Sequence, residues 1–181
     1  FKDALAAAQR AQRVLLQRLG PLDSEAIAAQ VTLGVIQDQL RDDAAAIVTL
    51  RAAVAAIEAA FGTHDARLVS ALQPLGEVLR REREFEAARA VLLRGADIAR
   101  TQIGPRNVQL SAILTRRATL ERDAGDARGA IAVLDEAERA LPDNEPSARA
   151  QLLATRGGTW IELGDGSRAE ADLAEALRLR R

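Results

Sequence analysis

Apolar residues recur along the chain at the spacing of amphipathic helices. In residues 84–103, Phe85, Ala88 and Leu92 fall on one face, and most of the charged residues fall off it. The same spacing predicts nine helices, joined within pairs by breaks of two or three residues that make neighbouring helices antiparallel. The expected ranges are 1–19, 24–41, 43–61, 65–82, 84–103, 107–123, 127–141, 147–163 and 167–181.

The pattern itself repeats every 42 residues. Gly20, Gly62 and Gly104 are 42 residues apart, and each follows an apolar residue, as expected where a helix ends in a left-handed glycine. Two further columns keep this step, with a last interval of 39: they are Ala46, Ala88, Ala130 and Ala169, and Leu50, Leu92, Leu134 and Leu173. We therefore expect a single repeat array over 1–181, made of a partial repeat (1–19) and four whole repeats (20–61, 62–103, 104–142 and 143–181). Because Phe1 falls within a repeat, we expect the chain to be a fragment of a longer one.

The amino-acid composition limits the possible fold classes and cellular locations. Hydrophobic residues make up 48% of the chain and aromatic residues only 2%, which supports an all-α fold and argues against an all-β one. The net charge of -1 lacks the basic footprint of a nucleic-acid binder, and the absence of Cys excludes disulfides and thiolate zinc sites. No apolar run approaches the roughly 18 residues that span a bilayer. We expect a cytoplasmic, bacterial protein that contacts neither nucleic acid nor membrane; the bacterial expectation rests on an almost exclusive use of Arg over Lys.

The columns resemble a known repeat family. Leu72-Gln73-Pro74-Leu75-Gly76, followed by Phe85, Ala88 and Leu92, resembles a tetratricopeptide repeat, and the 42-residue period is similar to the kinesin-light-chain type of that repeat. The resemblance implies a right-handed α-solenoid of stacked antiparallel helix pairs, whose first helices line a concave groove that binds a peptide or protein segment.

Small residues, and charged residues at positions that are usually apolar, indicate how the helix pairs should pack. A column of small residues in the first helices predicts close approach of the two helices of each pair: Gly34, Gly76, Ala118 and Gly157. Pro74 should kink or weaken its helix. Arg117, Glu121 and Arg156 stand where the family has apolar residues, and we expect Glu121 to lie between the two arginines in a structural ion-pair bridge.

The sequence contains no catalytic signature. There is no glycine-rich phosphate loop, and the single histidine, His64, stands beside Asp65, which favours a capping or solvated role over a metal or catalytic one. Asp42-Asp43 is read as a turn and helix cap, with a cation site as the minor alternative. We expect no catalytic residue, no metal and no cofactor.

A mixed, cationic-leaning strip is the candidate binding site. Projection of the first helices places these residues on the expected groove side: Gln73, Glu77, Arg80, Arg81, Thr115, Arg116, Thr119, Arg122, Gln151 and Thr155. Arginine forks bind carboxylates and phosphates, so an acidic partner would fit. The alternative is that these are solvated charges, paired with acids such as Glu77, Asp123 and Glu162.

Two functions remain open at this point. The first is a non-catalytic scaffold that binds a peptide or protein segment in the groove. The second is a sensory or regulatory module of a larger bacterial Ser/Thr kinase or transcription regulator; an independent enzyme is a distant third. Uncovered faces at the ends of the array also predict weak self-association.

Overall fold

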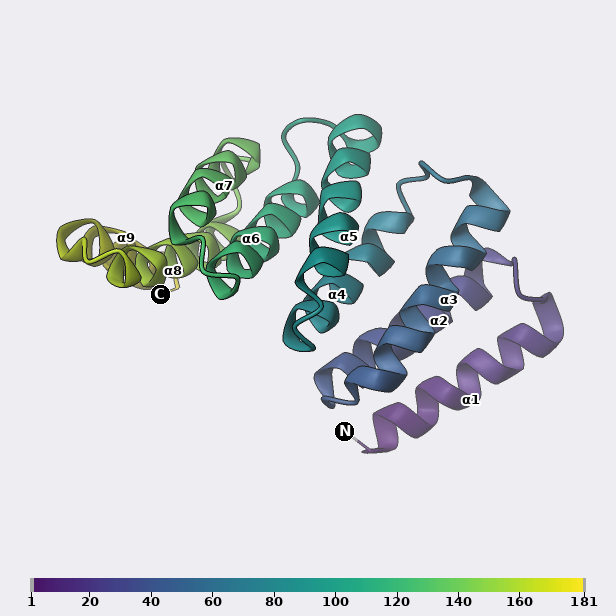
Figure 1. Cartoon of the computed structure of the whole chain (residues 1–181). Helices are drawn as coiled ribbons and strands as arrows, with labels where there is room; N and C mark the ends of the chain where they lie inside the picture. Colours follow the sequence, from purple (N-terminus) through teal and green to yellow (C-terminus); the bar gives the residue numbers. More distant parts are fainter. Residues whose placement is uncertain (1, 181) are drawn as a thin grey trace. The chain divides into compact units, whose positions relative to one another are not determined.

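The computed structural model describes residues 2–180; Phe1 and Arg181, which belong to the expected first and last repeats, lie outside this range. Within it the chain is helical and contains no strand, so the predicted all-α fold is confirmed (Figure 1). The elements are α1 (Lys2–Leu19), α2 (Ser24–Gln39), α3 (Asp43–Phe61), α4 (Leu68–Arg81), α5 (Phe85–Ile98), the π-helical turn η1 (Ala99–Ile103), α6 (Val108–Asp123), α7 (Ala127–Ala140), α8 (Pro146–Glu162) and α9 (Gly166–Leu179).

Short polar residues begin the helices. Asp42, Asp126 and Asp165 each cap a second helix by accepting a hydrogen bond from a backbone N–H three residues on, at 3.3, 2.8 and 3.1 Å. Helix α4 begins later than expected because Asp65 Oδ1 accepts from the N–H of Arg67 at 2.8 Å and holds residues 65–67 in a turn. The helix then continues through Pro74, whose side chain is buried.

Left-handed residues end the helices. Gly20, Gly62 and Gly104 have φ values of 89°, 96° and 134°, as predicted for glycines that follow a helix. A second column lies in the turn inside each helix pair and also has positive φ: Arg41 (63°), Arg83 (61°), Gly125 (93°) and Gly164 (78°). In each of these four turns the following N–H bonds a carbonyl five residues back, so one turn geometry recurs in every pair.

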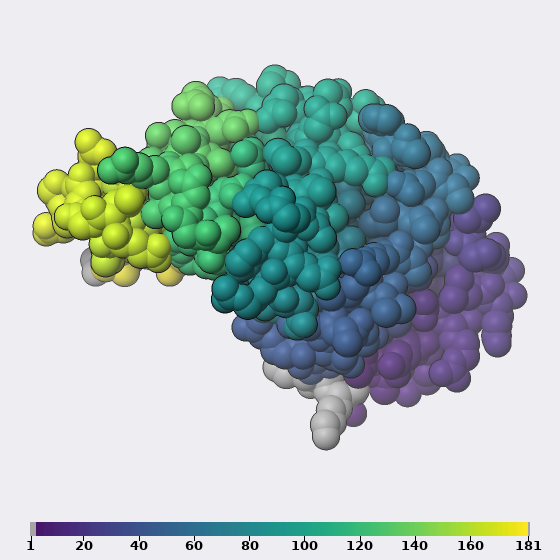
Figure 2. Space-filling view, in the orientation of Figure 1, coloured from purple at the N-terminus to yellow at the C-terminus, as the bar shows by residue number. Residues whose placement is uncertain are grey.

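The chain divides into two compact units, residues 1–94 (unit 1) and residues 95–181 (unit 2). In unit 1, α2 packs against α1, α3 and α4; in unit 2, α6 packs against α7 and α8, and α8 packs against α9. Side chains fill the spaces that the ribbons of each unit leave open (Figure 2).

The small-residue column brings the helices of a pair into contact, as predicted. A Cβ on Gly76 would lie 2.5 Å from Leu92, and one on Gly34 would lie 2.7 Å from Leu50. In unit 2, a Cβ on Gly157 would lie 2.7 Å from Leu173. The alanines of the second helices, Ala46, Ala88, Ala130 and Ala169, are also buried. Leucine from one helix therefore packs on bare backbone of the other.

Helix α3 corrects the expectation about membrane spans. It is the one helix among residues 2–180 that has the length and apolarity to cross a bilayer, with 19 residues and a mean hydropathy of 1.8. The sequence predicted no apolar run of this length; Arg51 and Glu58 do interrupt the run in α3, but its many alanines raise the average. Ala46, Leu50, Ala53 and Ile57 on one side of α3 are buried in unit 1, and helices in protein cores pass the same test, so this is weak evidence for a span.

Candidate functional site

The expected groove residues of unit 1 all lie on α4. Gln73 is half-buried, and Glu77 accepts from Arg80 Nη2 at 2.7 Å. Arg81 reaches back to the preceding repeat, where its guanidinium contacts Asp38 on α2 and Asp43 on α3, each at 2.5 Å. Arg81 therefore joins three helices of unit 1.

The charges of Arg81, Asp38 and Asp43 stabilise one another. The hydrogen bond from Arg81 holds the pKa of the Asp43 carboxyl below its ordinary value, although partial burial of Asp43 acts in the opposite direction. The same hydrogen bond raises the pKa of Arg81. A ligand that took Arg81 would leave Asp38 and Asp43 without their cation, so we leave Arg81 out of the proposed binding site.

The expected groove residues of unit 2 lie on α6 and α8, which are in contact. Thr115 is buried and donates to the carbonyl of Ser111 at 2.8 Å. Thr119 and Thr155 likewise donate to carbonyls of their own helices, at 3.1 and 3.0 Å, which leaves their oxygens able to accept. Arg116 is half-buried on α6 and Gln151 is exposed on α8.

Arg122 bridges α6 and α8 loosely. Its Nε lies 3.4 Å from Glu162 Oε1 on α8 and its Nη2 lies 3.9 Å from Asp123 Oδ1, and neither contact has hydrogen-bond geometry within the described part of the chain. Gly158 faces it from α8, where an added Cβ would meet only Arg122 Nη1, at 3.7 Å. Arg122 thus stands beside open space with donors that its neighbours do not use.

Of the two arginines that were expected to pair with Glu121, only one does so. Glu121 is buried and pairs with Arg117 at 3.7 Å, as predicted. Arg156 turns to the second helices instead, with Asp172 at 2.7 Å and Glu138 at 2.6 Å. The column places Arg156 one repeat after Arg117, but the nearest carboxylates lie on α7 and α9, so Arg156 pairs there.

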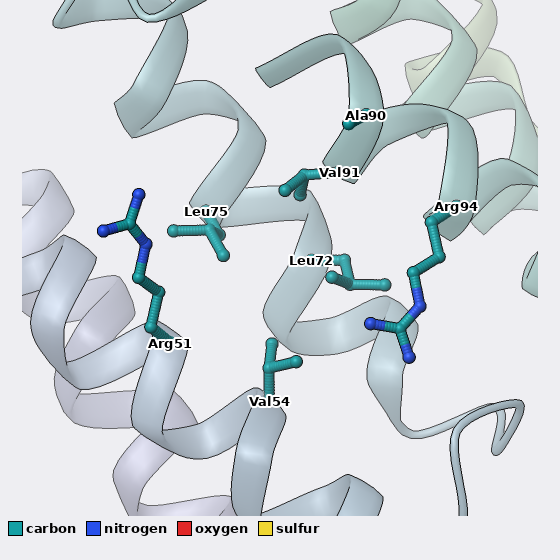
Figure 3. Close-up of a pocket in the computed structure, with 7 residues that line it drawn as sticks. All are labelled: Arg51, Val54, Leu72, Leu75, Ala90, Val91 and Arg94. Atoms are coloured by element: carbon teal, nitrogen blue, oxygen red, sulfur yellow. The ribbon is translucent and has the colours of Figure 1, made fainter. Parts of the chain in front are cut away.

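Sequence reasoning missed one groove in unit 1. It has a volume of about 280 Å³ and opens between α3 and α5, with α4 beneath (Figure 3). The residues that line it are Arg51, Val54, Leu72, Leu75, Ala90, Val91 and Arg94. Leu72 and Leu75 were assigned to the repeat motif as core. The sequence does contain a signal for the groove: the residues at equivalent repeat positions differ between the two units. Leu75 of unit 1, for example, is replaced by Arg156 in unit 2.

Residues 2–180 offer no metal centre: no group of three or more His, Cys, Asp or Glu side chains converges there. His64 is exposed, and its Nδ1 lies 3.0 Å from Thr63 Oγ1. Asp42 caps α3, and Asp43 pairs with Arg81.

Comparison with known proteins identifies the class of fold. No family model matches the chain, and no curated protein matches it. Several solved structures do. BtubC (BKLC) from P. vanneervenii aligns over 97% of this chain and 69% of its own, with a TM-score of 0.77 and 19% identity. A kinesin-light-chain protein of Podosopora anserina with nearly identical TPR-like repeats aligns over 99% and 86%, with a TM-score of 0.77 and 13% identity.

A third similar structure is MamA, residues 41 to the end, from Desulfovibrio magneticus RS-1. It aligns over 99% of this chain and 96% of its own, with a TM-score of 0.63 and 14% identity. The chain therefore has the fold of tetratricopeptide-like repeat proteins, an α-solenoid of stacked helix pairs.

Proposed function

We propose that this chain is a non-catalytic interaction module that binds an acidic segment of a protein partner on the α6–α8 face. This face is defined by Thr119 and Arg122 on α6 and by Thr155 and Gly158 on α8. The observation that carries the proposal is Arg122, whose carboxylate neighbours lie at 3.4 and 3.9 Å without hydrogen-bond geometry.

The contrast with Arg81 supports this choice. Arg81 is held by two carboxylates at 2.5 Å, and all three side chains are largely buried. Glu162, the nearer partner of Arg122, is 51% exposed. A carboxylate of a partner can displace Glu162 into water at small cost, and a guanidinium can hold the incoming group with two parallel hydrogen bonds.

The neighbouring residues suit an extended or helical segment rather than a small substrate. Gly158 leaves space beside the guanidinium, and the oxygens of Thr119 and Thr155 can accept hydrogen bonds from backbone N–H groups of the segment.

The test is a binding screen against short synthetic peptides that are acidic, neutral or basic. We expect acidic peptides to bind and Arg122→Glu to weaken them by about tenfold, because one attraction becomes a repulsion. Gly158→Leu, which fills the open space, should block binding and preserve the helical circular dichroism. Arg106→Glu is the control, since it removes an exposed pair with Asp143 elsewhere in unit 2. Equal weakening by the control, or no preference for acidic peptides, would refute the proposal.

Weak self-association stays a prediction of the same kind. Leu173 and Leu177, one helical turn apart on α9, are 38% and 56% exposed, and Ile161 on α8 is exposed as well. Sedimentation over a range of protein concentrations tests it, and a monomer at every concentration would contradict it. A cytoplasmic location and the lack of nucleic-acid binding are likewise proposed rather than shown.

A further inference from the structure

The groove of unit 1 between α3 and α5 lies apart from the α6–α8 face and has a different chemistry. We propose that it is a second docking site, which takes an aliphatic side chain flanked by carboxylates in a protein partner. We call it the α3–α5 groove, defined by the seven residues that line it in Figure 3.

The floor and walls of the groove are apolar. Leu72 and Leu75 of α4 are almost fully buried and form the floor, while Val54 of α3 and Val91 of α5 are half-buried at the sides. Ala90 is exposed at the edge of the groove. A volume of about 280 Å³ exceeds what one or two aliphatic side chains fill, so the groove can accept them without opening the helices.

Two arginines flank this apolar surface. Figure 3 shows Arg51 and Arg94 on opposite sides of Leu72, Leu75 and Val91. Arg94 is fixed there, since its Nη2 contacts Glu58 at 2.5 Å and donates to the carbonyl of Thr63 at 2.8 Å. Arg51 is 56% exposed, and its Nη2 lies 3.7 Å from Glu84, itself about half exposed. Arg51 is therefore the cation that an incoming carboxylate can take over.

At the equivalent positions of unit 2, charged side chains of the chain itself pair with one another. Two repeat steps along the chain, Leu75 corresponds to Arg156, and Arg51, Val54 and Val91 correspond to Asp135, Glu138 and Asp172. There Arg156 bonds all three of these carboxylates, at 3.1, 2.6 and 2.7 Å. Unit 1 has the opposite sign of charge at the rim, and Leu75 rather than a charged side chain lies at its centre; Arg94 is held by Glu58, while Arg51 has only the loose contact with Glu84 at 3.7 Å.

This difference determines the chemistry of the occupant. An apolar floor favours an aliphatic side chain, and the exchangeable Arg51 favours a carboxylate beside it. A lipid or an uncharged apolar ligand would use the floor and ignore the arginine. A basic segment would be repelled by Arg51 and Arg94. An acidic–aliphatic protein segment uses both features.

The experiment measures fluorescence anisotropy of a labelled peptide, Asp-Glu-Leu-Ile-Asp-Glu, titrated with the Arg122→Glu variant of the whole chain, in which the α6–α8 face binds acids only weakly. Two control peptides replace Leu-Ile by Ser-Ser or the four acids by Lys. We expect only the first peptide to bind at this site. Ala90→Phe should abolish its binding by filling the groove, and Arg51→Glu should weaken it by roughly three- to tenfold.

Matched variants separate this site from the others. Ala171→Phe places the same ring at the equivalent exposed position of unit 2 and should leave binding intact. Because Arg122→Glu is present in every titration, the α6–α8 face contributes little to the anisotropy change, and each proposal can fail without the other. Equal binding of the Ala90→Phe variant, or of the Ser-Ser peptide, would overturn the inference. So would loss of self-association on Ala90→Phe in peptide-free protein, because a second copy would then be the occupant.

Discussion

The two units build equivalent helix pairs around different interiors. In unit 1, Leu75 is buried between α3 and α5 and leaves an apolar groove. In unit 2 the same column holds Arg156, which draws α7 and α9 together through Glu138 and Asp172. Burial opposes ionisation of Glu138, but hydrogen bonds from Arg149 and Arg156 outweigh it and lower its pKa. The same helix arrangement therefore accepts either an apolar or a charged residue at this repeat position, provided that the residues around it also change.

Exchanging the two fillings should produce the largest effect. Leu75→Arg would bury a cation whose neighbours are Arg51, Val54, Val91 and Arg94, so we expect a loss of about 4 kcal/mol in the free energy of unfolding. Arg156→Leu should cost about 2 kcal/mol, because Asp172 loses its cation and Glu138 keeps only Arg149. Denaturant unfolding measures both. Recovery of part of the loss in Arg156→Leu/Asp172→Leu would confirm the cause, and no recovery would contradict it.

The Arg81 cluster gives the next effect. Arg81→Ala leaves Asp38 and Asp43 partly buried without a cation, and we expect it to lower the free energy of unfolding by about 2 kcal/mol at neutral pH. The native pKa of Asp43 is lowered, so this stabilisation is complete above the unfolded pKa of about 4 and is lost as the pH falls further. Unfolding measured from neutral pH downward should show the two proteins converging in acid. A difference that stayed constant with pH would show that Arg81 acts by packing alone.

Alanine substitutions of the helix glycines should cost stability according to how freely the facing side chain can move. Gly76→Ala should destabilise by about 2–3 kcal/mol, because the new methyl meets Leu92, which is buried and cannot move. Gly157→Ala should cost less, about 1 kcal/mol, since Leu173 is 38% exposed and can shift; the remaining cost comes from the backbone oxygen of Ala169, 3.3 Å from the new methyl. The control is Gly158→Ala, which has room for its methyl and should stabilise α8 by roughly 0.5–1 kcal/mol. Thermal unfolding in the reverse order would contradict this packing account.

The left-handed turn column should show the smallest effect. Arg83→Gly should stabilise unit 1 by roughly 1 kcal/mol, because arginine pays a steric penalty at a φ of 61° that glycine avoids. Gly125→Ala at the matching turn of unit 2 should destabilise by a similar amount, since its φ is 93°. Thermal unfolding tests the pair, and changes of the same sign in both variants would show that the turns are not equivalent.

Helix positions and close packing followed from the sequence because they depend on neighbours within one helix pair. The Gly76 column and the glycines that end the helices needed only the repeat step and the steric rules for glycine. The partners of Arg156 depended on which of several nearby carboxylates its flexible side chain reaches, and periodicity does not settle that. The α3–α5 groove escaped notice for a related reason: Leu75 fits the repeat motif, and only the joint change at its neighbours distinguishes an open groove from a filled core.

The central claim is that unit 1 presents an apolar groove to a partner at the place where unit 2 has the ionic cluster around Arg156. Ala90 and Ala171 occupy equivalent, exposed positions beside the two grooves, so their methyl signals in a nuclear magnetic resonance titration report on each one separately. On addition of the peptide Asp-Glu-Leu-Ile-Asp-Glu, we expect the methyl signals of Ala90, Val54 and Val91 to shift and saturate while that of Ala171 stays in place. Equal shifts at Ala90 and Ala171, or no shift at Ala90, would contradict the account.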